Sequence, residues 1–251
     1  MKYRIADYMF ELSPHEYGSL DRFLADYLCE EVKIDFYIMI DDLDVKNEMV
    51  LAEIKYYESN PLLHSTAIQR KLAEWLPLHN AFVLHSATFD VDGVGVAFAA
   101  HSGTGKTTHM NLWQQLLGDR MVVVNGDKPI VRFFDEEPNT PYAYGTPWNG
   151  KEHLGCNMRT PLKHICFIER SETNYVEKVQ KQDVINRIFN QVYMPKDPVA
   201  VANTMTLIDR LLSCTDLWII HCNMEPSAAE VAYNTIINGK ISVGNDQCVV
   251  P

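Results

Sequence analysis

One short run, Ala-His-Ser-Gly-Thr-Gly-Lys-Thr-Thr at residues 100–108, constrains this chain more than any other. An apolar run precedes it and an amphipathic run follows it, which predicts a strand, a tight loop and then a helix. Gly103 and Gly105 carry no Cβ, so the backbone can curl and direct successive N–H groups at one anion. The N-terminus of the following helix also favours negative charge. The run therefore predicts a phosphate-binding loop.

The side chains of this run have separate predicted roles. Lys106 supplies a cation that can reach the β- and γ-phosphates of a nucleotide, and the Thr107 hydroxyl can bind Mg²⁺. The predicted nucleotide-binding residues are Ser102, Gly103, Thr104, Gly105, Lys106, Thr107 and Thr108. Ala100 stands where the usual pattern opens with glycine. A chance glycine-rich turn is the alternative, but the spacing between strand and helix favours phosphate binding.

Composition limits the class of protein. The 251 residues are 47% hydrophobic and 22% charged, enough to bury the core of one large or two unequal domains. A net charge of -11 argues against nucleic acid or an anionic membrane as the main partner. The six cysteines lack tight metal-binding spacing, and no segment reaches the roughly 18 apolar residues of a membrane span. With no signal-peptide pattern at the start, we expect a cytoplasmic protein.

The chain divides into two predicted parts. Residues 1–62 are expected to form a small N-terminal β-rich subdomain, and residues 63–251 a nucleotide-binding domain of α/β class with a mixed sheet. The first part is predicted to contain extended segments at 3–11, 32–40 and 49–57, a helix over 20–31 and an acidic hairpin connection at 41–44. A helix over 65–76, capped by Ser65, follows it.

The predicted phosphate loop is expected to follow directly after the second strand of a β-hairpin. Residues 81–89 and 94–100 are rich in β-forming side chains, and Asp90 to Gly93 between them is a turn signal. A short apolar strand at 121–124 is then followed by Asp127. A carboxylate at the end of a strand adjacent to the phosphate loop is where a metal-binding aspartate is expected. A plain Gly-Asp turn is the alternative.

Four segments together carry a resemblance to a known family. They are Leu-His-Ser-Ala at 84–87, the hairpin reaching 93–96, the loop at 102–108, and Gly126-Asp127. Over about residues 80–135 this combination resembles the core of HPr kinase/phosphorylase. The sequence Ser-Gly-Thr-Gly-Lys-Thr-Thr is also similar to the corresponding motif of ATP-dependent phosphoenolpyruvate carboxykinase, which shares that fold.

The resemblance implies an α/β core with a mixed sheet, ATP with Mg²⁺, and phosphoryl transfer to a hydroxyl group. By position, Lys106 would hold the β- and γ-phosphates, Thr107 and Asp127 the metal ion, and His85 would lie near the transferred group. Read from the residues alone, His85 could equally be a half-buried structural histidine.

Two departures from the family pattern concern the acceptor. The family typically has two adjacent acidic residues where this chain has Gly126 and Asp127, and the missing one is expected to act as base on the acceptor hydroxyl. The HPr-docking region has no convincing counterpart in residues 144–170. The protein HPr is therefore not predicted as the substrate.

A second loop, at 145–151, is the predicted acceptor side. Its Trp148 could lie against a substrate and its Lys151 against a phosphate or carboxylate. A structural turn with a packed tryptophan is the alternative. Arg159, just before a strand predicted over 163–169, could supply positive charge to the transferred phosphoryl group, or could face solvent.

The leading hypothesis is an ATP-dependent kinase acting on a small-molecule or peptide hydroxyl, with a homo-oligomer possible. The candidate catalytic residues are Lys106, Asp127, His85 and Arg159. The alternative is a nucleotide-binding regulatory or ATPase module, which the absent second acidic residue would favour. A carboxykinase-type lyase lacks an arginine-rich carboxylate site in this sequence.

Overall fold

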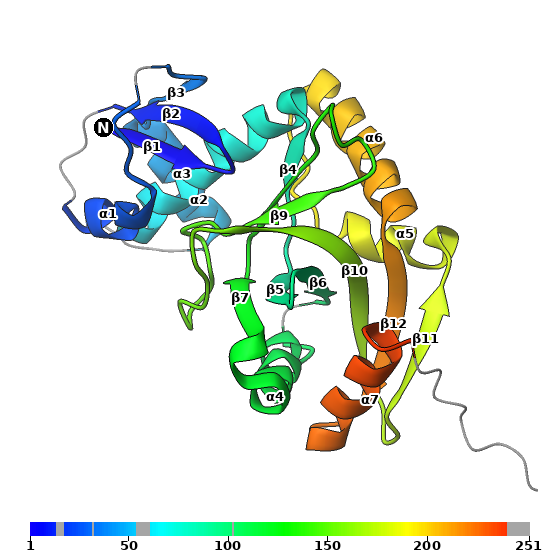
Figure 1. Cartoon of the computed structure of the whole chain (residues 1–251). Helices are drawn as coiled ribbons and strands as arrows, with labels where there is room; N and C mark the ends of the chain where they lie inside the picture. Colours follow the sequence, from blue (N-terminus) through cyan, green and yellow to red (C-terminus); the bar gives the residue numbers. More distant parts are fainter. Residues whose placement is uncertain (14–17, 32, 54–60, 102, 240–251) are drawn as a thin grey trace, which may run out of the picture.

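The computed structural model describes residues 1–13, 18–31, 33–53, 61–101 and 103–239. Within these ranges the chain is a mixed α/β fold, in which a nine-stranded mixed sheet is accompanied by a three-stranded sheet near the N-terminus (Figure 1). The α/β class predicted from the sequence agrees with this architecture. Its assignment to a phosphate-loop kinase core stays a prediction.

The long strand β10 (Arg159–Arg170) organises the large sheet. Its first residues pair antiparallel with β9 (Tyr142–Tyr144), and the remainder lies parallel to β6 (Val94–Ala99) on one side and to β12 (Asp216–Cys222) on the other. The remaining strands extend the sheet in the order β4-β8-β9-β10-β6-β5-β7, with β11 beside β12: β4 (Ala81–Val83), β5 (Ala87–Val91), β7 (Met121–Asn125), β8 (Ile130–Arg132) and β11 (Tyr175–Val179).

Alternate residues of the central strands belong to two different cores, because successive side chains of a strand point to opposite faces. Ala97 and Phe167 lie in a cluster with α5 (Lys181–Phe189) and α6 (Pro198–Cys214). Phe98 and Cys166 lie in a cluster with α4 (Lys106–Leu117) and α7 (Pro226–Ile236). Helices therefore cover both faces of this part of the sheet (Figure 1).

The N-terminal part contains helices as well as strands. The expected extended segment 3–11 is a hairpin of β1 (Lys2–Ile5) and β2 (Tyr8–Leu12), whose turn residues Ala6 and Asp7 have φ of 52° and 59°. β3 (Phe36–Ile38) pairs parallel with β2, and the expected helix over 20–31 is shortened to α1 (Gly18–Phe23) and the 3-10 turn η1 (Ala25–Tyr27).

The prediction of a strand over 49–57 and of a hairpin connection at 41–44 was wrong. α2 (Asp42–Leu51) occupies this stretch, and residues 54–57 lie outside the described part of the chain. Asp41 is its N-cap: the Asp41 carboxylate accepts a hydrogen bond from the Asp44 N–H at 2.8 Å, and Asp44 returns the contact to the Asp41 N–H. This reciprocal cap stabilises a helix start where an acidic cluster alone indicated a turn.

The expected boundary at 62/63 falls inside α3 (Pro61–Trp75), so Ser65 is not a helix cap. One hydrophobic cluster joins Tyr3 and Phe10 of the N-terminal sheet with Ala81 and Ile130 of the large sheet. The division into two domains therefore stays a prediction, and the core crosses the proposed boundary. Two more 3-10 turns complete the described elements: η2 (Leu76–His79) and η3 (Gly118–Arg120).

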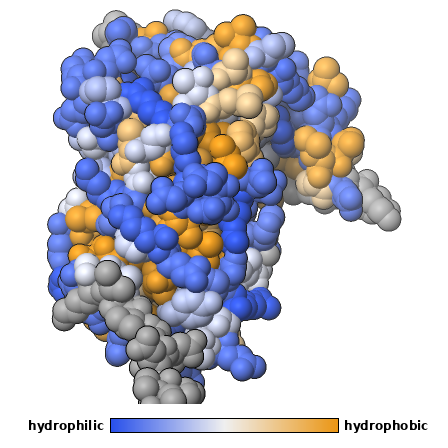
Figure 2. Space-filling model, turned by 90° about the vertical axis from the view of Figure 1, so that its right-hand side faces the viewer, coloured by the Kyte–Doolittle hydropathy of each residue, from blue (hydrophilic) through white to orange (hydrophobic). Residues whose placement is uncertain are grey.

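The hairpin predicted before residues 100–108 is confirmed, since β5 and β6 pair antiparallel around the turn at Asp92 and Gly93. The expected strand over 81–89 is split into β4 and β5, however, with residues 84–86 between them. No helix in the described ranges has both the length and the apolar character needed to cross a membrane. The face seen in Figure 2 is largely hydrophilic, with apolar patches interrupted by polar side chains.

Candidate active site

The loop between β6 and α4 has the backbone conformation that its glycines permit. Gly103 has φ of +79° and Gly105 has φ of +120°, and Gly105 is the N-cap of α4. A Cβ built on either glycine would meet nothing within 4 Å. Backbone conformation, not lack of space, therefore requires glycine at both positions. Ser102 lies outside the described residues.

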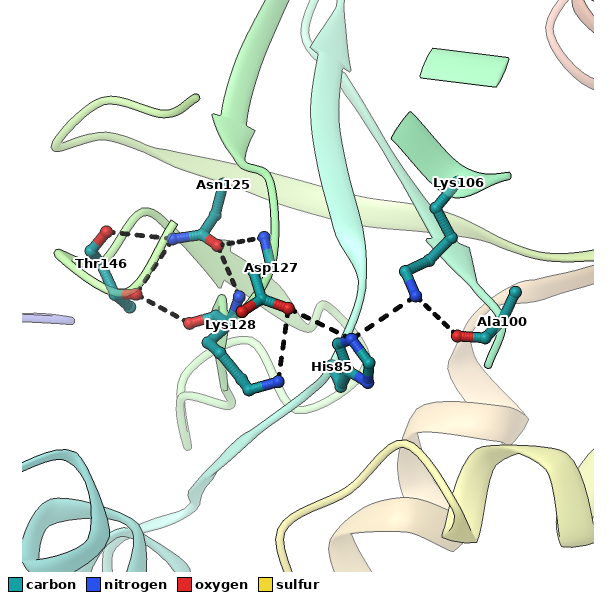
Figure 3. A network of polar contacts seen from close by, with 7 residues as sticks. All are labelled: His85, Ala100, Lys106, Asn125, Asp127, Lys128 and Thr146. Atoms are coloured by element: carbon teal, nitrogen blue, oxygen red, sulfur yellow. Dashed lines mark hydrogen bonds and ion pairs between the residues drawn. The ribbon is translucent and has the colours of Figure 1, made fainter. Parts of the chain in front are cut away.

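Lys106 begins α4 and is only 9% exposed. Its Nζ donates to the Ala100 carbonyl at 2.7 Å and lies 3.5 Å from His85 Nε2 (Figure 3). Burial lowers the pKa of Lys106, and the negative charge of Asp127 opposes this shift. Within the described chain this ammonium group has no ion pair, so its charge is available to an anion.

His85 is held by the backbone on both sides. Its N–H donates to the Gln191 carbonyl at 2.6 Å, and the N–H of the next residue, Ser86, donates to the Asp127 carbonyl at 3.0 Å. The imidazole Nε2 then lies 3.1 Å from Asp127 Oδ1. Figure 3 shows the second ring nitrogen pointing away from both Asp127 and Lys106. The structure thus brings the predicted His85, Asp127 and Lys106 together.

Asp127 follows the end of β7 in a turn stabilised by Asn125. Asn125 Oδ1 accepts from the N–H groups of Asp127 at 2.9 Å and Lys128 at 2.7 Å, and Asn125 Nδ2 donates to the Thr146 carbonyl at 3.0 Å (Figure 3). Asn125 is fully buried. Sequence reasoning missed its role, although an asparagine side chain commonly accepts a hydrogen bond from the backbone N–H two residues further on.

The charge state of Asp127 results from opposing effects. Burial raises the pKa of this carboxyl group, but the hydrogen bond from His85 and the charge of Lys128, whose Nζ is 3.3 Å from Asp127 Oδ1, outweigh it. The net pKa is lowered, so Asp127 is ionised at neutral pH. Within the described residues the second oxygen, Oδ2, has no hydrogen bond or ion pair.

The strand that ends before Asp127 lies near the loop, as expected, but does not pair with the strand that leads into the loop. β5 lies between β6 and β7 and pairs antiparallel with both. Residues 84–86, just before β5, form backbone hydrogen bonds with the chain around Asp127. This segment, and not β7 itself, connects Asp127 with the loop. His85 therefore bridges the carboxylate and the loop lysine.

The sequence has glycine in place of a second acidic residue at position 126, and the fold explains why. A Cβ at Gly126 would lie 2.9 Å from the Asn149 carbonyl oxygen and 3.2 Å from that of Leu154. The Gly126 N–H also donates to Leu154 O at 2.8 Å. The loop that covers β7 thus leaves no space for a side chain, and Asp127 is the only carboxylate this turn can present.

His85, Lys106 and Asp127 line one cleft of about 430 Å³ beside the loop between β6 and α4. Among the predicted site residues it contains Gly103, Gly105, Lys106, Thr107, Thr108, His85, Asp127 and Lys151. Glu152, which sequence reasoning did not select, also lines it. Lys151 therefore lies at the cleft, where the sequence placed it.

Trp148 does not lie at the cleft. Its side chain is 9% exposed, its Nε1 donates to the Ser65 carbonyl and to Ser65 Oγ, both at 3.0 Å, and its ring packs against Phe23. The prediction of a substrate contact at Trp148 is corrected to the structural alternative, a packed tryptophan. The contact of the indole with Phe23 joins the N-terminal part of the chain to the loop at 145–151.

The prediction for Arg159 is also corrected. Its Nη1 lies 3.2 Å from Asp7 Oδ2 and 3.0 Å from the Tyr144 hydroxyl, away from the cleft. The arginine at the loop is Arg170, at the other end of the same strand, whose Nη2 donates to Gly103 O at 2.7 Å. The predicted strand ended at Glu169. Phe167 of β10 pairs with Ala99 at the end of β6, so Arg170, three residues further along, lies beside the loop.

A second cavity of about 420 Å³ lies on another side of the loop. Thr104 and Arg170 line it together with the less polar side chains of Ile168 and Met224. His109 also lines it, and burial lowers the pKa of this histidine to about 4, so its ring is neutral. The cavity thus combines polar and apolar side chains, as small-molecule sites commonly do.

The donor atoms of the cleft fit Mg²⁺. This ion prefers oxygen ligands and is usually held by one or two carboxylates together with phosphate oxygens and water. Asp127, with its free Oδ2, and the Thr107 hydroxyl both line the cleft. Bound there with a nucleotide, Mg²⁺ would neutralise phosphate charge.

No protein-family model and no curated protein matches the chain. Among solved structures it is similar to the Hpr(Ser) kinase/phosphatase from Coxiella burnetii, with 11% sequence identity and a TM-score of 0.27, covering 51% of this chain and 90% of that one. A likeness at this level establishes neither the family nor the activity of this chain.

Proposed function

We propose that the protein is an ATP-dependent phosphotransferase that transfers the γ-phosphoryl group to a hydroxyl acceptor. The observation that carries the proposal is the chain of contacts from Lys106 through His85 to Asp127 at the edge of a loop whose glycines have positive φ. A cation, a carboxylate and exposed backbone N–H groups in one cleft are the requirements of phosphoryl transfer.

In this proposal, His85 accepts the proton of the attacking hydroxyl. Nε2 is closer to Asp127, at 3.1 Å, than to Lys106, at 3.5 Å, which favours a tautomer with the proton on Nε2. The other nitrogen, Nδ1, is then the basic one. Asp127 stabilises the charge that the ring acquires, so a base is present without a second acidic residue.

The transfer itself forms one bond and breaks one. The acceptor oxygen bonds to the γ-phosphorus while the bond from this phosphorus to the β–γ bridging oxygen breaks, and the electron pair leaves with ADP. The acceptor proton goes to His85 Nδ1. Lys106 and the loop N–H groups stabilise the charge on the phosphoryl oxygens, and positioning supplies the remainder of the rate.

The test is incubation of the purified protein with γ-labelled ATP and Mg²⁺, with and without a mixture of hydroxyl metabolites and serine- or threonine-containing peptides. Label in an acceptor-containing product is the expected result. Binding of ATP is measured separately by calorimetry. Absence of nucleotide binding at millimolar ATP would contradict the whole proposal.

A second function is favoured by the lack of space at Gly126. If no acceptor is used, the same cleft would hydrolyse ATP slowly, with water in place of the hydroxyl, and act as a nucleotide-dependent switch. Phosphate release that is unchanged by any acceptor would support this module over the kinase.

A further inference from the structure

A cavity of about 360 Å³ adjoins the cleft on the other side of His85. It lies between α3 and the segment 190–193, and His85 lines both spaces. Each space has its own lysine: Lys106 lines the cleft and Lys128 the cavity, and Figure 3 shows the two lysines on opposite sides of His85. A molecule held in the cavity would contact the same histidine as a phosphate bound at the loop.

The cations of the cavity wall are partly exposed and already paired. Arg70 of α3 and Lys128 each keep 30% of the side chain exposed. Arg70 Nη2 donates to Glu48 Oε2 at 2.9 Å, and Lys128 Nζ lies 3.3 Å from Asp127 Oδ1. A carboxylate or phosphate would find no unpaired positive charge here, whereas a neutral ligand would not need one.

These paired cations still offer hydrogen-bond donors. Arg70 donates from Nε and Nη2 to Glu48 and from Nη1 to the Tyr193 hydroxyl, and its remaining guanidinium N–H groups have no partner in the described chain. The ammonium group of Lys128 contacts only Asp127 among the described residues, so it too retains free N–H groups. The matching ligand therefore presents oxygen atoms that accept hydrogen bonds but carry no charge.

The other side chains of the wall are neutral. Ala73, Val83 and Val192 are apolar, while Thr66 and Asn190 carry a hydroxyl and an amide group. A hydroxyl group can both donate and accept a hydrogen bond, and a carbon skeleton can pack on apolar side chains. Neutral polar groups beside an apolar surface thus suit a compound with several hydroxyl groups.

We propose that this cavity binds the acceptor of the reaction, and that the acceptor is a neutral compound with neighbouring hydroxyl groups, such as a sugar or another polyol. The inference rests on the proposed function. One hydroxyl oxygen, at His85, bonds to the γ-phosphorus while the bond from this phosphorus to ADP breaks. The electron pair of that bond stays on ADP, and the hydroxyl proton passes to His85. Other hydroxyl groups accept from Arg70 and Lys128, so α3 contributes directly to the choice of acceptor.

The test compares a neutral and an anionic sugar that differ only at the sixth carbon: methyl α-D-glucopyranoside and methyl α-D-glucopyranosiduronate. The further probes are myo-inositol, a second neutral polyol, and N-acetyl-L-serinamide, a neutral compound with a single hydroxyl group. Binding to the full chain, loaded with Mg²⁺ and a non-hydrolysable ATP analogue, is measured by ligand-observed NMR.

We expect millimolar binding of the glucoside or of myo-inositol, and at least several-fold weaker binding of the uronate and of the serinamide. Equal or tighter binding of the uronate would overturn the neutral character of the ligand. Equal or tighter binding of the serinamide would overturn the need for neighbouring hydroxyl groups. Absence of binding by both neutral polyols would overturn the proposal as a whole.

Thr66→Phe places an aromatic ring at the cavity and leaves the loop cleft unchanged, because Thr66 lines only the first of these spaces. We expect binding of the neutral polyol to weaken at least about 10-fold, equivalent to about 1.4 kcal/mol, with unchanged binding of ATP. Thr206→Phe is the matched control. Thr206 is exposed on α6 and, like Thr66, donates its hydroxyl to the carbonyl four residues earlier, so this variant should bind the polyol normally.

The outcomes separate this inference from the proposed function. If a neutral polyol binds and Thr66→Phe weakens it, but no phosphoryl transfer occurs, the kinase proposal fails and the cavity assignment stands. If transfer occurs with an unchanged acceptor KM in Thr66→Phe, the cavity assignment fails and the kinase proposal stands. Weaker binding of ATP by Thr66→Phe, with unaltered binding of the polyol, would likewise overturn the cavity assignment.

Discussion

The two spaces on either side of His85 differ in how their charges are balanced. In the loop cleft, Lys106 is buried without an ion pair in the described chain, and its Nζ contacts the Ala100 carbonyl oxygen and His85 Nε2. In the neighbouring cavity, Arg70 is paired with Glu48 and Lys128 with Asp127. The first arrangement favours a polyanion and the second a neutral polar ligand.

This difference teaches that the count of basic residues near a site says little about its ligand. What matters is whether each cation already has a carboxylate partner, as Lys128 has in the adjacent Asp127 and Arg70 has in Glu48 of α2. A net charge of -11 is compatible with a phosphate site because the unpaired charge is local.

The largest expected effect comes from removing the contact between Asp127 and His85, the residue that lines both spaces. Asp127→Asn removes the charge that orients and stabilises His85, so phosphoryl transfer should fall about 10²- to 10⁴-fold, as for loss of acid–base assistance. ATP binding should remain measurable by calorimetry, because Lys106 and the loop are unchanged. Asp209→Asn, an exposed partner of Lys181, is the control. Normal transfer by Asp127→Asn would refute its assigned role.

A second prediction concerns how the stability of the fold depends on pH through His109. The pKa of His109 is lowered to about 4 by burial, below the ordinary value of 6.5, so the unfolded chain takes up a proton first as pH falls. Stability linked to His109 is present above pH 6.5 and is lost towards pH 4, by about 3 kcal/mol at 1.36 kcal/mol per unit.

His109→Gln keeps an acceptor for Trp113 Nε1 and should remove this part of the acid destabilisation. Urea unfolding at pH 7 and pH 4.5 measures the difference between variant and wild type. His153→Asn, an exposed position, should retain the wild-type pH dependence. A parallel loss of stability in wild type and His109→Gln would show that His109 is not buried as described.

The third prediction compares one lysine from each space. Lys106→Ala should lose charge-assisted contacts to phosphate of about 1.5–3 kcal/mol, and so raise the Kd for Mg-ATP roughly 10- to 100-fold. Lys128→Ala should affect ATP affinity much less, since Lys128 is paired with Asp127. Equal losses in the two variants, measured by calorimetry, would contradict the difference in charge balance.

The smallest effect concerns the two ends of β10. Arg170→Ala removes the hydrogen bond to Gly103 O, and ATP affinity should fall about 5-fold for a contact of about 1 kcal/mol. Arg159→Ala should leave ATP affinity unchanged, because its partners are Asp7 and Tyr144. The reverse order of effects would restore the original prediction for Arg159.

Much of the large sheet was predictable, and the N-terminal part less so. Apolar spacing predicted α4 and the strands β6, β7 and β10, while α2 was missed because its helical pattern is weak and its start is fixed by the Asp41–Asp44 cap. Trp148 was misplaced because a tryptophan in a glycine-rich loop has the same sequence appearance whether it packs on α3 or faces a ligand.

The sequence by itself determined the loop, because glycine conformations and a helix N-terminus are properties of neighbouring residues. Only the tertiary structure decided that β5 separates β6 from β7, that His85 spans the gap to Asp127, and that Arg170 rather than Arg159 lies at the loop. These contacts join residues far apart in the chain, and strand pairing, which sequence spacing does not record, brings them within hydrogen-bond distance.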